Sequence, residues 1–132
     1  MLLSNLTYKC KNPQGEIIEK NTGEVVSTIK KAILKHVDAK YIYLFGSYAY
    51  GKPEEDSDID IYIVTPDNVK SHADLSAKIF GLLRKNKIYF VDLVFVKESA
   101  FQKKEYLVEK IIHEKGILLY ERERFGAAAK TR

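Results

Sequence analysis

The sequence contains one cysteine, Cys10, so it cannot form an internal disulfide, and a reducing, cytoplasmic location is expected. It lacks an apolar run long enough to cross a bilayer. Its first residues also lack the basic-then-apolar order of a signal peptide. No internal repeat is present. These absences argue against a disulfide-stapled secreted domain and against a membrane protein, and we expect no membrane partner.

The sequence also lacks a large excess of charge of either sign, because 22 basic and 18 acidic residues leave a formal net charge of only +4. This mild basic excess would suit a polyphosphate or nucleic-acid partner, but a solvated surface is the simpler explanation. We therefore expect no direct binding to nucleic acid. At 132 residues, 45% hydrophobic and 30% charged, the chain can form one hydrophobic core but is too short for two ordinary domains.

Hydrophobic periodicity predicts alternating helices and strands between residues 23 and 120. Apolar residues three and four positions apart predict helices over residues 23–37 and 69–83. Short apolar runs predict strands over residues 41–45, 58–64, 88–96 and 117–120. Ser99 followed by Gln102 resembles a capping box and predicts a helix that ends at Gly116. This order predicts an α/β (α+β) fold in which helices pack on a small mixed β-sheet.

The two ends of the chain have weaker patterns. Residues 1–22 are interpreted as an N-terminal extension, in which Leu6, Tyr8 and Cys10 alternate with polar residues before a plausible turn, so a short hairpin can form there. Residues 121–132 have no core pattern and are expected to be a disordered tail. The globular domain is therefore expected to span residues 23–120.

Five carboxylates lie between residues 54 and 60, at the start of an isoleucine-rich strand. Because strand side chains alternate, Asp58 and Asp60 are expected on one face and three isoleucines on the buried face. Asp92 lies in another apolar strand with no lysine or arginine nearby, so its charge needs a partner. A divalent cation shared by Asp58, Asp60 and Asp92 would satisfy all three, and oxygen-only ligands favour Mg²⁺ or Mn²⁺ over Zn²⁺. The alternatives are a solvated pair at a strand edge for Asp58 and Asp60, and for Asp92 a place at the exposed end of its strand or a pairing with a distant lysine.

Gly46 and Ser47 directly follow the predicted strand over residues 41–45. A glycine lets the backbone approach a ligand closely, and the serine hydroxyl and the amides of the next turn can bind phosphate oxygens. An ordinary turn would explain Gly-Ser alone. Ten residues later, however, the Asp-x-Asp pair begins, and this spacing makes the combination specific.

The order Gly46-Ser47, ten residues, Asp58-x-Asp60 and a later Asp92 resembles the signature of the minimal nucleotidyltransferases of the DNA polymerase beta superfamily. The resemblance covers residues 22–120. It implies a polymerase-beta-like fold and the transfer of a nucleotide, expected to be AMP, from a nucleoside triphosphate to an acceptor hydroxyl. It also implies that the catalytic and metal-binding residues, which hold two Mg²⁺ ions, are Asp58, Asp60 and Asp92. The nucleotide-binding residues that it implies are Gly46, Ser47, Gly51 and Lys52.

Short members of this family commonly work beside a small helical HEPN protein, as antitoxin to a toxin ribonuclease, and modify a tyrosine of that partner. The resemblance therefore implies a HEPN-type partner and protein adenylyltransferase activity. Many members have an arginine before the second glycine, where this chain has Tyr50 before Gly51, and Lys52 is a candidate replacement. Two alternatives stay open: a non-catalytic antitoxin that acts by binding, and nucleotidyl transfer to a small molecule such as an aminoglycoside.

Overall fold

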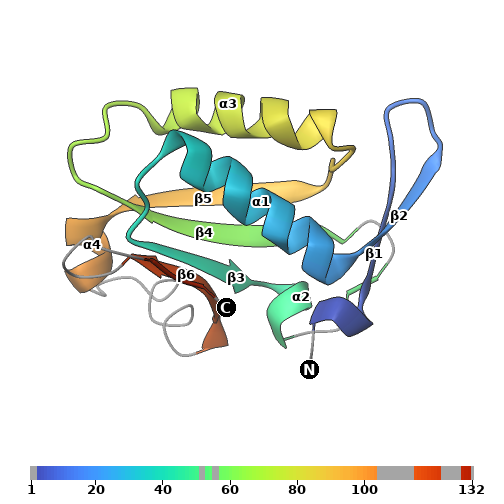
Figure 1. The fold of residues 1–132 in the computed structure, drawn as a ribbon, viewed down its shortest axis with the longest axis horizontal. Coiled ribbons are helices and arrows are strands. Elements are labelled where there is room, and N and C mark those ends of the chain that lie inside the picture. Colours follow the sequence, from blue (N-terminus) through green and yellow to red (C-terminus); the bar gives the residue numbers. More distant parts are fainter. Residues whose placement is uncertain (1–2, 51–52, 55–56, 104–114, 123–128, 132) are drawn as a thin grey trace.

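The computed structural model shows a mixed β-sheet with helices packed on it and a hairpin beside it (Figure 1). It describes residues 3–50, 53–54, 57–103, 115–122 and 129–131. Within these residues the sheet has the strand order β5 (Val91–Lys97), β4 (Ile59–Thr65), β3 (Tyr41–Phe45), β6 (Ile117–Arg122) and β7 (Ala129–Thr131). Strands β4 and β5 are parallel, whereas the other neighbouring strands are antiparallel. This arrangement confirms the predicted fold class.

Two long helices, α1 (Thr22–His36) and α3 (His72–Lys85), cover one face of the sheet (Figure 1). Helix α1 buries one apolar stripe, and its first turn is capped by Asn21, whose side-chain oxygen accepts the N–H of Glu24 at 3.2 Å. The core between helices and sheet includes Ile29, Ile33, Ile79 and Leu83 from the helices and Ile42, Leu44, Ile59, Ile61 and Ile63 from the strands.

The opposite face of the sheet carries an aromatic layer. Tyr43, Tyr62 and Phe101 are buried there together with Val64, and Phe101 comes from helix α4 (Glu98–Lys103). The Phe101 ring centroid lies 6.0 Å from that of Tyr43 and 6.1 Å from that of Tyr62. Strand β4 is therefore buried on both faces, whereas the sequence pattern had assigned burial only to its isoleucines.

Strands β1 (Thr7–Lys11) and β2 (Ile17–Asn21) form an antiparallel hairpin that follows a single 3₁₀ turn, η1 (Leu3–Asn5). The side-chain oxygen of Asn12 accepts the N–H groups of Gln14 and Glu16, and Gly15 takes a φ of +84°, so the turn closes locally. Tyr8 and Cys10 of β1 are fully buried in the core that contains α1 and α3. The hairpin thus contributes Tyr8 and Cys10 to the core, while its turn projects away from the sheet (Figure 1).

The strand predicted for residues 88–96 begins only at Val91, because Ile88 closes the end of α3. Lys87 has a φ of +58°, its N–H donates to the carbonyl of Arg84 at 3.0 Å, and the N–H of Ile88 donates to the carbonyl of Leu83 at 3.0 Å. This is a Schellman motif, in which a left-handed residue ends the helix. Because the N–H of Ile88 is used at this helix end, β5 begins only at Val91.

The starts of two helices also differ from the prediction. Helix α3 begins at His72, because the side chain of Ser71 caps it by accepting the N–H of Asp74 at 3.1 Å. Helix α4 begins at Glu98, and the N–H of Ser99 donates to the side chain of Asp67 at 3.0 Å, so Ser99 does not act as the cap. No helix in the described ranges is long and apolar enough to span a bilayer.

The segment predicted to be a disordered tail contains regular structure. Strand β6 continues to Arg122, and Ala129–Thr131 pair with it as β7. The guanidinium of Arg122 donates to the carboxylate of Asp38 at 2.6 Å, which ties β6 to the loop after α1. Residues 104–114, in the middle of the last predicted helix, lie outside the described residues.

The left-handed residue at the end of α3 gives a test of this helix end. Lys87→Gly should raise the free energy of unfolding by about 0.5–1 kcal/mol, because glycine adopts a positive φ without the steric cost that lysine has. Lys85→Gly, two residues earlier in the helix, should instead lower it by about 1 kcal/mol. Urea denaturation would measure both, and equal destabilisation by the two variants would contradict the assigned helix end.

Candidate functional site

The candidate site lies where β3 ends and β4 begins. Strand β3 ends at Phe45, which pairs with Asp60 of the antiparallel strand β4. Gly46 follows with a φ of +72°, and the chain then turns into the short helix α2 (Ser47–Tyr50), whose first turn is closed by the N–H of Ala49 donating to the carbonyl of Gly46 at 3.0 Å. The sequence-predicted pair Gly46-Ser47 is thus placed directly beside Asp60.

Gly46 and Asp60 approach each other so closely that a side chain at position 46 would force the Asp60 carboxylate to shift. A Cβ atom added to Gly46 would overlap Oδ2 of Asp60 and would lie only 3.0 Å from its Cγ. The positive φ of Gly46 independently disfavours an L side chain. The carboxylate of Asp60 therefore occupies the space that a side chain at position 46 would need.

The three predicted carboxylates lie at the starts of the neighbouring strands β4 and β5. Asp60 and Asp92 are register partners on the parallel strands β4 and β5, and Asp58 stands immediately before β4. Strand alternation places Asp60 and Asp92 on the same sheet face as Tyr62, which is the aromatic face. The prediction that these residues gather at one place agrees with this register.

The electrostatics of the site centre on Asp60, which is half-buried. Partial burial, followed by the negative charges of Asp92 and Asp58, raises the pKa of the Asp60 carboxyl to about 6. Asp58 and Asp92 themselves are exposed. The expectation that Asp92 is a buried charge in need of a partner is therefore wrong, because β5 is an edge strand at this position and leaves the side chain open to solvent.

These residues fit a divalent cation in donor type, since all three offer carboxylate oxygens and a positive charge would relieve their repulsion. Within the described parts of the chain, however, no group of three or more His, Cys, Asp or Glu side chains is arranged to hold a metal ion. Mg²⁺ is commonly held by one or two carboxylates and completed by substrate phosphates and water, an arrangement that requires no such group.

Not every predicted residue can be placed. Gly51 and Lys52, and with them the candidate replacement for the family arginine, lie outside the described residues. Ser47 is half-buried at the start of α2. In the acidic loop, Glu54 is exposed and its N–H donates to the hydroxyl of Ser57 at 2.8 Å, which shapes the approach to β4.

Sequence reasoning gave no role to Tyr8, yet the structure connects it to both sides of this site. Its ring lies 6.5 Å from that of Tyr48 in α2, and its hydroxyl accepts hydrogen bonds from the backbone just before β5. The alternation of residues 6–10 indicated that Tyr8 could be buried. Nothing local in the sequence indicated its partners, which are 81 and 82 residues away.

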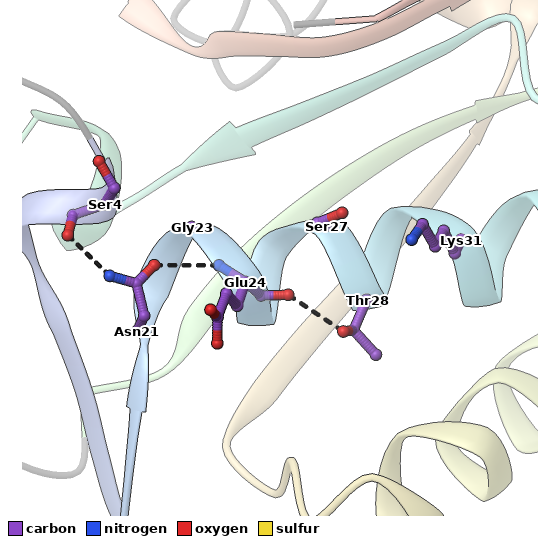
Figure 2. A pocket seen from close by; sticks show the side chains of 7 residues that line it. All are labelled: Ser4, Asn21, Gly23, Glu24, Ser27, Thr28 and Lys31. Carbon is purple, nitrogen blue, oxygen red and sulfur yellow. Dashed lines mark hydrogen bonds between the residues drawn. The ribbon is translucent and has the colours of Figure 1, made fainter.

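A surface hollow at the start of α1 contains none of these carboxylates (Figure 2). Ser4, Asn21, Gly23, Glu24, Ser27, Thr28 and Lys31 line it. Its polar groups bond to one another: the amide of Asn21 donates to the carbonyl of Ser4 at 2.7 Å, and the hydroxyl of Thr28 donates to the carbonyl of Glu24 at 3.0 Å. We therefore interpret the hollow as the capped end of α1 and not as the reaction site.

Comparison with known proteins agrees with this geometry. The family model described as "Polymerase beta, Nucleotidyltransferase" matches residues 27–125. The chain belongs to this family. The range that matches the nucleotidyltransferase model contains Gly46, Ser47 and all three aspartates.

Two solved structures resemble this nucleotidyltransferase in fold. A candidate nucleotidyltransferase from Sulfolobus solfataricus is 20% identical, with a TM-score of 0.53 over 76% of this chain and 81% of that one. A toxin–antitoxin structure with AMP-PNP is 24% identical, with a TM-score of 0.54 over 76% of each chain. No curated protein matches the sequence significantly.

The raised pKa of Asp60 predicts a pH-dependent cost to stability. Because the folded state holds this proton more tightly than the unfolded state, stability decreases as the pH rises from about 4 to about 6. Without divalent cations, Asp60→Asn should therefore be more stable than the wild type at neutral pH, on the order of 1 kcal/mol after allowance for solvent screening. The difference should vanish below about pH 4. Urea denaturation in chelator at both pH values measures it, and a less stable variant at neutral pH would contradict it.

The close approach of Gly46 and Asp60 predicts a specific coupling. Gly46→Ala should destabilise more than Gly15→Ala, because both glycines have a positive φ but an added Cβ at Gly15 meets no atom within 4 Å. Adding Asp60→Ala should recover the excess loss at position 46 and should not rescue Gly15→Ala. A double-mutant cycle is expected to give a coupling energy of at least about 1 kcal/mol, and purely additive effects would show that no overlap occurs.

Proposed function

We propose that this chain transfers a nucleotide, most readily AMP, from a nucleoside triphosphate to an acceptor hydroxyl with Mg²⁺ as cofactor. The observation that carries the proposal is the placement of Asp60 against the Gly46 backbone, with Asp92 beside it on the parallel neighbouring strand. Membership of the polymerase beta nucleotidyltransferase family supports this type of reaction.

The position of each carboxylate suggests a separate role for it in the reaction. Asp58 and Asp60 would hold Mg²⁺ together with the triphosphate, and the Gly46 backbone, Ser47, Gly51 and Lys52 would bind the phosphates. Bound Mg²⁺ neutralises charge on the triphosphate and on the leaving pyrophosphate. The acceptor oxygen forms a bond to the α-phosphorus as the bond to pyrophosphate breaks. Asp92, which is exposed, would also hold the metal, and it accepts the proton that the acceptor hydroxyl releases.

The proposed acceptor is a tyrosine of a small helical HEPN-type protein, with this chain as the antitoxin. The fold of a toxin–antitoxin structure solved with AMP-PNP supports this choice of partner and nucleotide. The exposure of Asp92 on an edge strand also supports it, because a protein acceptor needs an open approach. Transfer to a small molecule is the alternative for the same chemistry.

A second candidate function is neutralisation by binding alone. It is favoured by Tyr50 before Gly51, the position at which the family resemblance implies an arginine in many members. The two functions differ in a single product, a covalent AMP group on the partner.

Intact-mass spectrometry of the partner separates these functions. When a small helical HEPN-type protein that co-purifies with this chain is incubated with the wild type, ATP and Mg²⁺, we expect the mass of that protein to increase by one AMP group. Neutralisation of the partner without any mass increase would overturn the proposed transfer and support the binder. A Tyr50→Arg variant that gains transfer where the wild type has none would identify Tyr50 as the cause.

Substitutions at the carboxylates test the division of roles. Asp92→Asn should retain ATP binding and lower the transfer rate about a hundredfold or more, since proton removal acts in the transition state. Asp58→Asn combined with Asp60→Asn should abolish Mg²⁺-dependent ATP binding, measured by calorimetry. Asp74→Asn removes the same charge from α3 and should change neither quantity. An Asp92→Asn variant with wild-type turnover would show that Asp92 has no part in the chemistry.

A further inference from the structure

Tyr8 connects the N-terminal hairpin to two parts of the candidate site, helix α2 and the segment that leads into β5. The side chain is fully buried, and its ring lies 6.5 Å from that of Tyr48, the residue after Ser47 in α2. Its hydroxyl oxygen accepts the N–H of Phe90 at 2.8 Å and the N–H of Tyr89 at 3.3 Å. These two amides belong to the segment that leads into β5 and Asp92.

The same segment also touches the start of β4. The carbonyl of Phe90 accepts the N–H of Ile59 at 3.0 Å, and Ile59 lies between Asp58 and Asp60 in the chain. One series of hydrogen bonds therefore leads from the Tyr8 hydroxyl through the backbone of Phe90 to the N–H of Ile59, between the two aspartates. Asp92 follows Phe90 by two residues on the parallel strand.

Packing of the core does not require the Tyr8 hydroxyl, because a phenylalanine ring would bury the same apolar surface. Burial raises the pKa of the Tyr8 hydroxyl, and so does a hydrogen bond with the Cys10 side chain, so the group stays neutral. A neutral hydroxyl keeps oxygen lone pairs for the two amides. The polar atom of Tyr8 is thus used entirely at the entrance to β5 and within its own strand.

We propose that Tyr8 is a positioning residue of the nucleotidyl-transfer site, whose hydroxyl sets the spacing between Asp92 and Asp60 while its ring supports α2. This inference rests on the proposed function. It assigns the hairpin a role in the reaction, although no atom of the hairpin needs to touch the substrate. Loss of the hydroxyl frees the segment before β5 to shift relative to β4, and the carboxylate spacing shifts with it.

Tyr8→Phe tests this role, because it keeps the ring and removes the hydrogen bonds. We expect kcat for transfer to fall about 10- to 100-fold, the range typical for groups that orient metal-binding residues, with KM for ATP changed less than threefold. Mn²⁺ affinity of the nucleotide-free protein, measured by electron paramagnetic resonance, should fall over the same range. Amide exchange at residues 89–92 should become faster.

Two controls distinguish positioning from general stability. Ile33→Val removes a buried methylene from α1, away from the carboxylates. This variant loses stability, as Tyr8→Phe does, but it leaves β5 unaltered. Tyr120→Phe removes the hydroxyl of another buried tyrosine of the same core. Both should retain wild-type kcat and Mn²⁺ affinity per folded molecule.

The outcomes separate this inference from the function on which it rests. If the wild type transfers AMP and Tyr8→Phe keeps its kcat and Mn²⁺ affinity, Tyr8 is only structural and the inference is overturned. If Ile33→Val loses as much kcat as Tyr8→Phe at equal stability, the inference is also overturned. A wild type with neither transfer nor Mn²⁺ binding overturns the proposed function itself, and this role of Tyr8 with it.

Discussion

The contact between Asp60 and the backbone of Gly46 is the constraint on which the candidate site depends. The antiparallel pairing of β3 with β4 brings Phe45 opposite Asp60, so the residue that follows β3 must leave room for a carboxylate. Glycine meets this requirement and also provides the positive φ that turns the chain into α2. The phosphate-binding turn expected from the sequence and the acidic pair of β4 are therefore one structural unit, held by strand register.

The two faces of the sheet differ in composition. This difference explains how the fold tolerates the partly buried carboxylate of Asp60, which lowers its stability. One face is closed by α1 and α3 over an aliphatic core, and this face provides most of the burial that stabilises the domain. The other face is aromatic, closed in part by Phe101 of α4, and it carries Asp60 and Asp92. The repulsion among the carboxylates is thus confined to the start of the two strands, while the apolar residues further along β4 and β5 hold the register.

Periodicity and spacing were sufficient to predict the sheet, the two long helices and the residues that meet at the site. Strand β3 is local and apolar, and its predicted bounds agree with the structure, as does the order of Gly46, Asp60 and Asp92 around it. The sequence pattern did not predict those elements whose formation depends on a residue far away in the chain. Asp67 replaces Ser99 as the cap of α4, and strand β7 gains its structure only by pairing with β6. The exposure of Asp92 depends on which strand lies at the sheet edge, and strand order cannot be read from local patterning.

The long reach of Tyr8 has a consequence for how the protein folds. Its hydrogen bond to Phe90 joins residues 82 positions apart, so it closes a loop that contains most of the chain. Closing such a loop costs entropy before its contacts repay the cost, and contacts of this kind slow folding. During synthesis the hairpin can form early, but the Tyr8 hydroxyl can accept the N–H groups of Tyr89 and Phe90 only after these residues have left the ribosome. The acidic edge of the sheet should therefore be completed late and in a single cooperative step, after the N-terminal hairpin has docked.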